Sequence, residues 1–274
     1  MGETKTKTIL VSNDDGFSSP GLHALALALE PLGRVIVVAP LTDQSAVSHG
    51  ISLKRPLRLI QQPSLKGKNG PIPVYSVDGT PVDSVYMALF KVLKSPPDLV
   101  VAGINKGANL GKDVIYSGTV SAAMEGALYG FPSVAFSLVN RTQEWDYRAS
   151  ASFAYAYCKM LLEVKDFPSG VVINVNVPQD LKSQKYAITC LGVHEYEQQV
   201  DERTSPMGDN YYWIGGSLKI LDASPGTDWG AISDGKISVT PLRPQYFSKP
   251  EMQWMGQQNV DDWNGQKETY QTED

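Results

Sequence analysis

The fold of this chain is decided by the stretch Thr8-Ile9-Leu10-Val11-Ser12-Asn13-Asp14-Asp15-Gly16, an apolar run that ends in two adjacent carboxylates and a glycine. A short apolar run bounded by turn residues is typical of a buried strand. Ionised carboxylates at the end of such a strand lose hydration and need a compensating charge. The acid pair therefore has two interpretations: a cation site, or a helix cap in which Asp15 or Ser18 precedes Pro20.

Apolar runs and helical patterns alternate along the first two-thirds of the chain, which predicts an α/β fold with a mainly parallel sheet. The segment Ile51–Gln62 interrupts this alternation and predicts an extended arm or hairpin. The expected strands are Thr8–Ser12, Arg34–Ala39, Val74–Val77, Asp98–Ala102, Ser133–Leu138 and Gly170–Val177. The expected helices are Pro20–Leu32, Pro81–Leu93, Val120–Tyr129 and Tyr147–Val164.

The character of the chain changes after about Pro178, which divides it into a core, residues 1–180, and a C-terminal β-rich extension, residues 181–274. Tyr211, Tyr212 and Trp213, near a charged run, predict a projecting hairpin, which is more typical of an oligomer contact than of a catalytic element. The segment from Gln257 is a polar, acidic tail. The short β-rich pieces of the extension are Ala187–Val193, Tyr211–Ile214 and Ile237–Thr240.

The composition is that of a soluble globular protein: 274 residues, 42% hydrophobic and 19% charged, with no apolar stretch as long as a membrane span. The net charge of −5 argues against binding to a nucleic-acid polymer. The short polar segment 1–7 favours a cytoplasmic location. Cys158 and Cys190 are expected to be buried thiols rather than a disulfide.

A structural zinc site is not indicated, because the chain has three histidines and no Cys-x-x-Cys pair. A metal in this protein would have to be a hard cation held by oxygen atoms. His49 is either a solvated surface histidine or a general acid or substrate contact. His23 is expected on a helix surface and His194 at a strand end.

Three further polar segments follow predicted strands or open a helix, where an open α/β sheet binds its ligands. They are Pro40–Gly50, Gly103–Asn109 and Tyr116–Thr119. The turn Ser117-Gly118-Thr119 runs into a helix and either binds an anion through its N–H groups and hydroxyls or only caps the helix. Asn105, between two glycines, has the alternative interpretation of a left-handed turn residue.

Taken together, two carboxylates, a hydroxyl and a side-chain amide from three strand ends make an all-oxygen set that suits Mg²⁺ or Mn²⁺. An anion site beside that set predicts a phosphomonoesterase.

The chain resembles the SurE family of survival-protein phosphatases, which act as 5′- and 3′-nucleotidases. The similarity extends over about residues 8–245. The segments that carry it are Asn13-Asp14-Asp15-Gly16 with Pro20-Gly21, Ala39-Pro40, Gln44-Ser45, Gly79-Thr80-Pro81 with Asp83, Gly103-Ile104-Asn105-Lys106-Gly107 and the run from Asn109 to Gly126.

The resemblance implies a Rossmann-like three-layer core and a C-terminal extension that exchanges elements between subunits, giving a homodimer or homotetramer. It implies hydrolysis of nucleoside monophosphates, and of short polyphosphate in some members. It also implies one divalent cation per subunit, Mg²⁺ or Mn²⁺, held by Asp14, Asp15, Ser45 and Asn105. We expect Asp14 and Asp15 to be catalytic, and Asn105, Ser117, Gly118 and Thr119 to bind phosphate.

Two rival hypotheses remain at this point. A covalent aspartyl-phosphate mechanism is disfavoured, because the Asp-x-Asp-x-Thr spacing is absent around Asp14 and Asp15. A non-catalytic nucleotide or metabolite sensor on a doubly wound scaffold is compatible with the fold. A pure anion binder, however, gains nothing from two carboxylates beside its phosphate unless a metal neutralises them.

Overall fold

The computed structural model describes residues 6–140, 142, 144–183, 185–244 and 248–256. They belong to two compact units, one that runs to Leu242 and one from Arg243 onward. The second unit contains helix α6, Lys249–Gly256, and the acidic tail from Gln257 lies outside the described residues. Among the described helices, none is long and apolar enough to cross a membrane.

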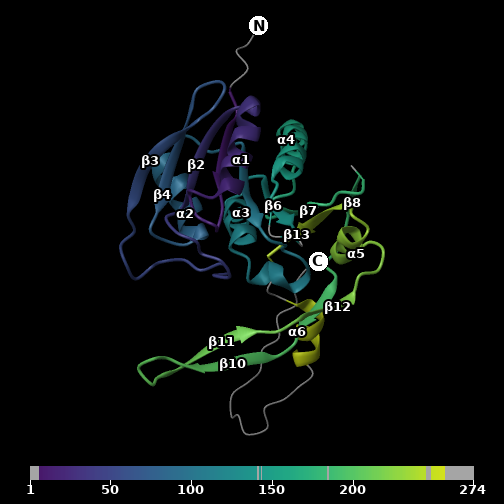
Figure 1. Cartoon of the computed structure of the whole chain (residues 1–274). Helices are drawn as coiled ribbons and strands as arrows, with labels where there is room; N and C mark the ends of the chain where they lie inside the picture. The colour runs from purple at the N-terminus through teal and green to yellow at the C-terminus, as the bar shows by residue number, and fades with distance from the viewer. Residues whose placement is uncertain (1–5, 141, 143, 184, 245–247, 257–274) are drawn as a thin grey trace. The chain divides into compact units, whose positions relative to one another are not determined.

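The first unit is built on a nine-stranded sheet with the order β3-β4-β2-β1-β5-β6-β7-β13-β8 (Figure 1). The six strands from β4 to β7 in this order run parallel, while β3 is antiparallel to β4 and β13 is antiparallel to β7. The strands are β1 (Thr8–Ser12), β2 (Arg34–Pro40), β3 (Leu59–Lys66), β4 (Pro71–Val77), β5 (Leu99–Lys106), β6 (Ser133–Val139), β7 (Val172–Pro178), β8 (Tyr186–Ile188) and β13 (Ile237–Leu242).

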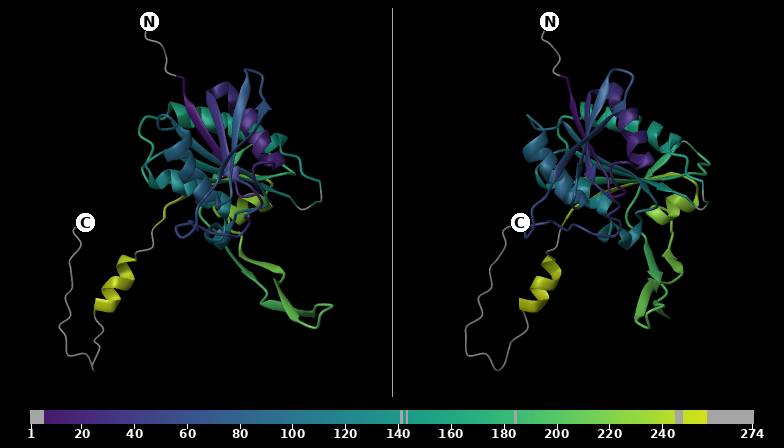
Figure 2. Two further views of the ribbon diagram at one scale, coloured as in Figure 1. Left: turned by 90° about the vertical axis from the view of Figure 1, so that its left-hand side faces the viewer. Right: turned by 60° about the vertical axis from the view of Figure 1, so that its left-hand side comes forward.

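Helices cover both faces of this sheet, as Figure 2 shows. Side chains alternate along β1, so that Ile9 and Val11 pack under α1 and α4 while Leu10 packs under α2 and α3. All three side chains are fully buried. The three-layer α/β fold expected from the sequence is therefore confirmed. The helices are α1 (Pro20–Leu29), α2 (Pro81–Met87), α3 (Gly118–Leu128), α4 (Arg148–Glu163) and α5 (Asp228–Ser233).

The predicted strands and helices of the first 180 residues form within a few residues of their expected bounds. The predicted strand Ala187–Val193 is wrong: β8 ends at Ile188, and β9 begins at Val193. Between them, the backbone N–H of Cys190 donates to Gly226 O, so the chain bends toward α5 instead of continuing as a strand. Cys190 is exposed, contrary to the sequence expectation, and Cys158 is buried as expected.

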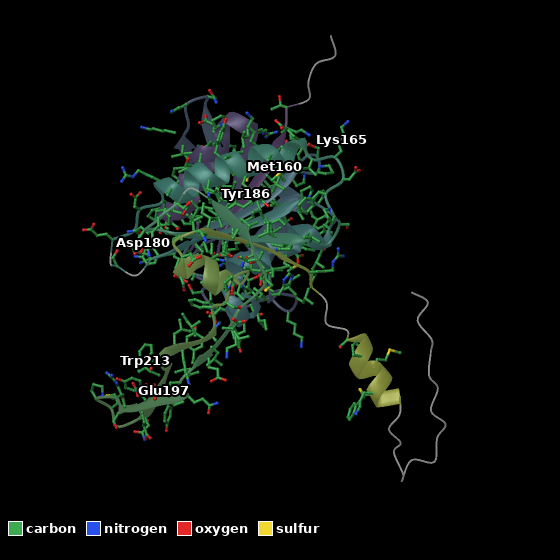
Figure 3. The ribbon with its side chains drawn as sticks, turned by 90° about the vertical axis from the view of Figure 1, so that its right-hand side faces the viewer. Met160, Lys165, Asp180, Tyr186, Glu197 and Trp213 are labelled. Carbon is green, nitrogen blue, oxygen red and sulfur yellow. The ribbon has the colours of Figure 1, made fainter. Side chains whose placement is uncertain are left out.

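The predicted hairpin is present as β10 (Gln199–Thr204) and β11 (Asn210–Gly215). It continues from a second antiparallel pair, β9 (Val193–Tyr196) and β12 (Leu218–Asp222). Figure 3 shows Trp213 and Glu197 on this arm, away from the sheet. The side chain of Ile214 is 92% exposed, so the hairpin presents apolar surface to solvent.

Asp228, at the start of α5, joins three segments that are far apart in the sequence. Its fully buried carboxylate accepts hydrogen bonds from Gly111 N at 2.7 Å, Gly192 N at 2.7 Å and Trp229 N at 2.8 Å. Gly111 begins the short 3₁₀ helix, Gly111–Ile115, that leads into α3. Asp228 therefore ties the segment before β9 to the turn that precedes α3.

A second contact joins the same elements. Trp229 Nε1 donates to His194 Nδ1 at 3.2 Å, so the ring proton of neutral His194 lies on Nε2, which donates to Asp113 Oδ1 at 3.0 Å. Tyr196 OH donates to the other Asp113 oxygen at 2.8 Å. His194 is only 1% exposed and lies inside a polar cluster.

Asp228→Ala is predicted to lower the free energy of unfolding by at least about 3 kcal/mol, because three buried N–H groups lose a charged acceptor. Asp228→Asn should cost less, since its amide oxygen still accepts. Urea unfolding measures both. The matched control is Asp234→Ala at the other end of α5, where solvent screens an exposed ion pair with Lys236 at 2.8 Å, so the loss is expected to be much smaller. Equal losses in Asp228→Ala and Asp234→Ala would contradict this role.

Candidate active site

The candidate site lies at the carboxyl ends of the parallel strands, where β1 separates β2 from β5. The strand order reverses at this point, and open α/β sheets bind ligands there. Asp14 and Asp15 follow β1 directly. The loop after β2 reaches them, because Gln44 N donates to Asp14 O at 2.8 Å. The end of β5 reaches them too, because Lys106 N donates to Asp15 Oδ2 at 3.1 Å.

Asp14 is the buried member of the acid pair and is 4% exposed. The Thr119 hydroxyl donates a hydrogen bond to its carboxylate. Gly118 packs directly against it, since a Cβ at that position would lie 2.7 Å from Asp14 Cβ and 3.1 Å from the Pro81 ring. Burial raises the pKa of Asp14 to about 6; the Thr119 bond opposes this rise and the Asp15 charge adds to it.

Asp15 is half-buried and reaches the surface of the site. Burial raises its pKa, the bond from Lys106 N opposes the rise, and the Asp43 carboxylate adds to it. The cap interpretation of Asp15 or Ser18 is wrong, because α1 has Ser19 as its N-cap residue and no side-chain cap bond. Asp15 is thus free of a capping role and faces the loops after β2 and β5.

The loop after β2 is held by its own polar contacts. The Ser45 N–H and hydroxyl both donate to Asp43 Oδ1, at 2.8 and 2.6 Å, and Ser45 is exposed. Ala46 and Ser48 have left-handed backbones with φ of 58° and 56°. Ser48 sustains this conformation by donating from N to Tyr116 O at 3.0 Å and from Oγ to Ile115 O at 2.7 Å. The loop is therefore fixed to the turn before α3.

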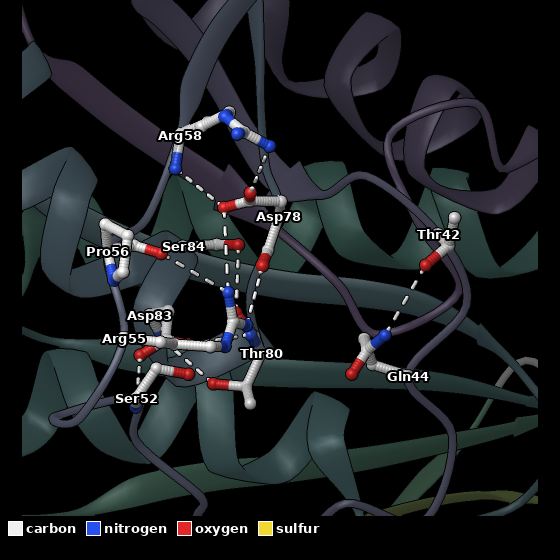
Figure 4. A network of polar contacts seen from close by, with 10 residues as sticks. All are labelled: Thr42, Gln44, Ser52, Arg55, Pro56, Arg58, Asp78, Thr80, Asp83 and Ser84. Atoms are coloured by element: carbon white, nitrogen blue, oxygen red, sulfur yellow. Dashed lines mark hydrogen bonds and ion pairs between the residues drawn. The ribbon is translucent and has the colours of Figure 1, made fainter.

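The arm that continues this loop is anchored on the start of α2. Thr80 and Asp83 form a reciprocal capping box there, and Ser52 N donates to Asp83 Oδ1 at 2.8 Å. Arg55 Nη2 donates to Asp78 O at 2.7 Å. Figure 4 shows this network together with Thr42 and Gln44 of the loop. The chain that follows Ser45 is thus attached at Ser48 to the turn before α3 and at Ser52 to the start of α2.

His49 is not a solvated surface histidine. Its Nε2 hydrogen-bonds Glu125 Oε2 at 2.8 Å, and the Glu125 side chain, on α3, is only 7% exposed. The pair attaches the loop to α3 itself. Sequence reasoning missed Glu125 as its partner, because nothing in the pattern of the sequence connects two residues 76 positions apart.

The sequence left an alternative open for Asn105 and for Ser117, and the structure places both residues. Asn105 lies within β5, and the left-handed residues are its neighbours Gly103 and Gly107, so the turn interpretation is wrong. Its Nδ2 donates to Gly107 O at 3.0 Å, which leaves the amide oxygen as the donor to a cation. Ser117 caps α3, since its Oγ accepts from Val120 N at 3.1 Å.

The candidate anion site is the first turn of α3. Gly118 and Thr119 begin this 11-residue helix, and N–H groups of a first helical turn have no partner within the helix. They lie directly beside the Asp14 carboxylate. Two anions side by side would repel each other, so the arrangement suits a phosphate only if a cation lies between it and Asp14.

The chemistry of the donors fits a hard divalent cation. The three carboxylates repel one another: the Asp15 charge raises the pKa of Asp14, and the Asp43 charge raises the pKa of Asp15. The Lys106 charge lowers the pKa of Asp15 and so stabilises its ionised form. Among the described residues, no three His, Cys, Asp or Glu side chains gather as metal ligands. An ion at this place would therefore need hydroxyl and amide oxygens as well, which is the kind of donor that Ser45 and Asn105 carry.

Comparison with known proteins gives a consistent result. Residues 9–198 match the family model described as Survival protein SurE. The 5′-nucleotidase SurE of Myxococcus xanthus is 48% identical over 87% of this chain and 88% of its own length. The 5′-nucleotidase SurE 1 of Thermus thermophilus is 47% identical over 85% of this chain and 90% of its own length. The crystal structure of the SurE protein from Aquifex aeolicus matches with a TM-score of 0.73 and 37% identity, over 90% of this chain and 98% of that one.

Asp14→Asn is predicted to stabilise the protein at pH 8 in the absence of divalent cations. The pKa of Asp14 is raised from its ordinary value of 3.8 to about 6, so folding favours the protonated acid. The stability that this preference contributes is complete below about pH 4 and is lost as the pH rises through about 6. A pKa difference of about two corresponds to about 3 kcal/mol, which the uncharged amide regains at most at pH 8.

Thermal unfolding of both proteins in chelator from pH 4 to pH 8 checks this expectation. The melting temperature of Asp14→Asn should rise above that of the wild type only as the pH increases. Added Mg²⁺ or Mn²⁺ should reduce the difference, because a cation neutralises the wild-type carboxylate. A difference that does not change with pH would contradict the role of burial at Asp14.

Proposed function

The chain belongs to the SurE family, and we propose that it is a phosphatase that hydrolyses nucleoside 5′- and 3′-monophosphates to nucleoside and phosphate, with short polyphosphate as a further substrate. The observation that carries the proposal is the buried Asp14 carboxylate against the first turn of α3. The relatives named 5′-nucleotidase SurE support the substrate class. A non-catalytic sensor is not favoured, because binding alone does not need a desolvated acid pair.

The metal ligands that we propose are Asp14, Asp15, Ser45 and Asn105, with one Mg²⁺ or Mn²⁺ per subunit. The chemistry that such an ion supplies when bound is Lewis-acid polarisation of a phosphoryl oxygen and a lowered pKa of water. The Ser45 hydroxyl donates its proton to Asp43 at 2.6 Å, which leaves the lone pairs of its oxygen for a cation.

The other roles follow from the chain's own groups. The N–H groups of Gly118 and Thr119 and the Ser117 hydroxyl hold the phosphate oxygens, and the Asn105 amide assists. Asp14 or Asp15 accepts the proton of the attacking water. Without a cation, burial raises the pKa of Asp14 to about 6, which makes this carboxylate a stronger base than an ordinary aspartate, and a bound cation would lower that pKa again. No covalent phosphoenzyme is formed in this scheme.

Phosphate release from a panel of nucleoside 5′- and 3′-monophosphates tests the function, with chelator or with added Mg²⁺ or Mn²⁺. We expect activity that is lost in chelator and restored by the ion. Asp14→Asn should lower kcat by at least about a hundredfold, because both charge stabilisation and proton acceptance depend on that carboxylate. Wild-type activity that survives chelation, or a phosphoenzyme trapped with labelled substrate, would overturn the mechanism.

We further propose that the division at residue 180 separates a catalytic core from an extension that exchanges elements between subunits, giving a homodimer or homotetramer. The exposed apolar side chains of the β10–β11 hairpin support a subunit contact: Val200 is 64% exposed, Trp213 62% and Ile214 92%. The cytoplasmic location that the composition favours stays a prediction.

Replacing Trp213 and Ile214 together by Ser is predicted to shift the protein to a smaller species in sedimentation experiments, because it removes apolar surface from the proposed contact. Leu53→Ser, at a side chain that is 82% exposed outside the hairpin, is the control and should leave the sedimentation coefficient unchanged. An unchanged species in the double variant would contradict the role of the hairpin.

A further inference from the structure

The half of the substrate that the proposed function leaves unassigned is the nucleoside. The end of β5 sends its last two side chains to opposite faces of the sheet, because strand residues alternate. Lys106 shares its side with Ile104, which packs in the core beneath α1 and α4. Asn105 therefore points to the α3 side, where the phosphate site lies. If the substrate phosphate lies on the α3 side, a nucleoside that extends across this edge of the sheet contacts Lys106.

The side chains of Trp145 and Tyr147 lie on this side of the sheet, and we call them the aromatic wall. The Lys106 ammonium lies over the ring of Trp145, 5.4 Å from its centroid, while the Lys106 backbone N–H bonds Asp15. Trp145 and Tyr147 are half-buried and pack against the core on the same side as Ile104. Burial and the Asp15 charge raise the pKa of Tyr147, so this ring also lies within reach of the acid pair.

The segment that carries the wall is held in place by β7, which is what stacking on a preformed surface requires. Gln179, directly after β7, donates from Nε2 to Glu144 O at 3.0 Å and accepts from Asp146 N at 3.1 Å. Tyr147 O accepts from Ala151 N at 2.8 Å in the first turn of α4. Trp145 is thus held between two anchored residues.

We propose that Trp145 is the nucleobase-stacking residue of this protein and that the Lys106 ammonium covers its ring until a base replaces it. The proposal rests on the nucleotidase function. The planar face of a purine or pyrimidine makes a larger contact with an indole than one ammonium group does, and stacking of this kind tolerates every base. The displaced ammonium stays tethered beside Asp15, near the substrate phosphate.

The test compares AMP with ribose 5-phosphate, which keeps the sugar and the phosphate but lacks the base. The quantity measured is the ratio of kcat/KM for AMP to kcat/KM for ribose 5-phosphate, in which any effect on the phosphate site cancels. Trp145→Ala should lower this ratio about tenfold, mainly through the KM for AMP. Trp145→Phe, which keeps a ring against the core, should lower it less.

Lys106→Met should change the same ratio in the opposite direction, by about two- to threefold, because the base no longer displaces a cation from the ring. The backbone bond to Asp15 is kept in this variant. Loss of the ammonium beside Asp15 should lower kcat/KM for both substrates, and this common effect cancels in the ratio. Tyr116→Ala tests the rival possibility that another ring stacks on the base, since Tyr116 directly precedes the turn Ser117-Gly118-Thr119 and is 58% exposed.

Two outcomes would overturn the proposal. One is an unchanged ratio in both Trp145 variants, whether or not kcat/KM falls for the two substrates together. The other is a selective loss for AMP in Tyr116→Ala. Each presupposes a wild-type enzyme that hydrolyses AMP. If the wild type releases no phosphate from AMP, the nucleotidase function itself fails, and the two failures are therefore distinguishable.

Discussion

Asp14 carries a carboxylate at the end of the central strand, almost out of contact with water and pressed against the first turn of α3. Such a group raises the free energy of the folded state unless another charge compensates it. The rest of the site is arranged around that constraint. The loop after β2 bonds to the Asp14 backbone, and the Thr119 hydroxyl bonds to the Asp14 side chain. The charges of Asp43 and Lys106 act in opposite directions on the neighbouring Asp15. In the proposed metal-dependent phosphatase, such a site would lose stability without a cation and gain affinity for one, which is common where function and stability compete.

The position of α3 matters for the same reason, and the C-terminal part of the chain determines it. Asp228 and the His194–Asp113 contact hold the 3₁₀ helix that leads into α3, and Ser48 bonds to the end of that helix from the other side. The first turn of α3 is therefore fixed by segments from both ends of the chain. Losing one of these contacts would move that turn relative to Asp14, and in the proposed phosphatase a shift of about 1 Å would be costly in catalysis.

Local patterns were sufficient for the six parallel strands of the sheet, since apolar runs such as that of β1 are buried on both faces, and helical spacing marks α1. They did not give the bounds of β3 or the place of β13 in the sheet. The clustering of acidic residues at strand ends was also predictable from the sequence, because the geometry of a parallel sheet brings the carboxyl ends of its strands together. Contacts between distant segments were not predictable. His49 hydrogen-bonds Glu125, which is 76 residues away in the sequence, and the Asp228 carboxylate accepts from Gly111 N, 117 residues away. The strand expected over Ala187–Val193 failed for this reason, as the chain there bonds to the segment before α5 and no local propensity announces that partner.

The last two residues of β5 show how one strand end can serve both halves of a substrate. Asn105 carries an amide oxygen toward the α3 side, whereas the side chain of Lys106 lies over Trp145 on the other side. The backbone of Lys106 meanwhile donates to Asp15, so the acid pair and the aromatic wall share a single anchor point. This coupling means that a change in side chain at position 106 can alter base recognition while the backbone contact to the acid pair persists. Specificity and chemistry can therefore vary separately on this scaffold, because strand alternation separates the side chains and the peptide bond joins them.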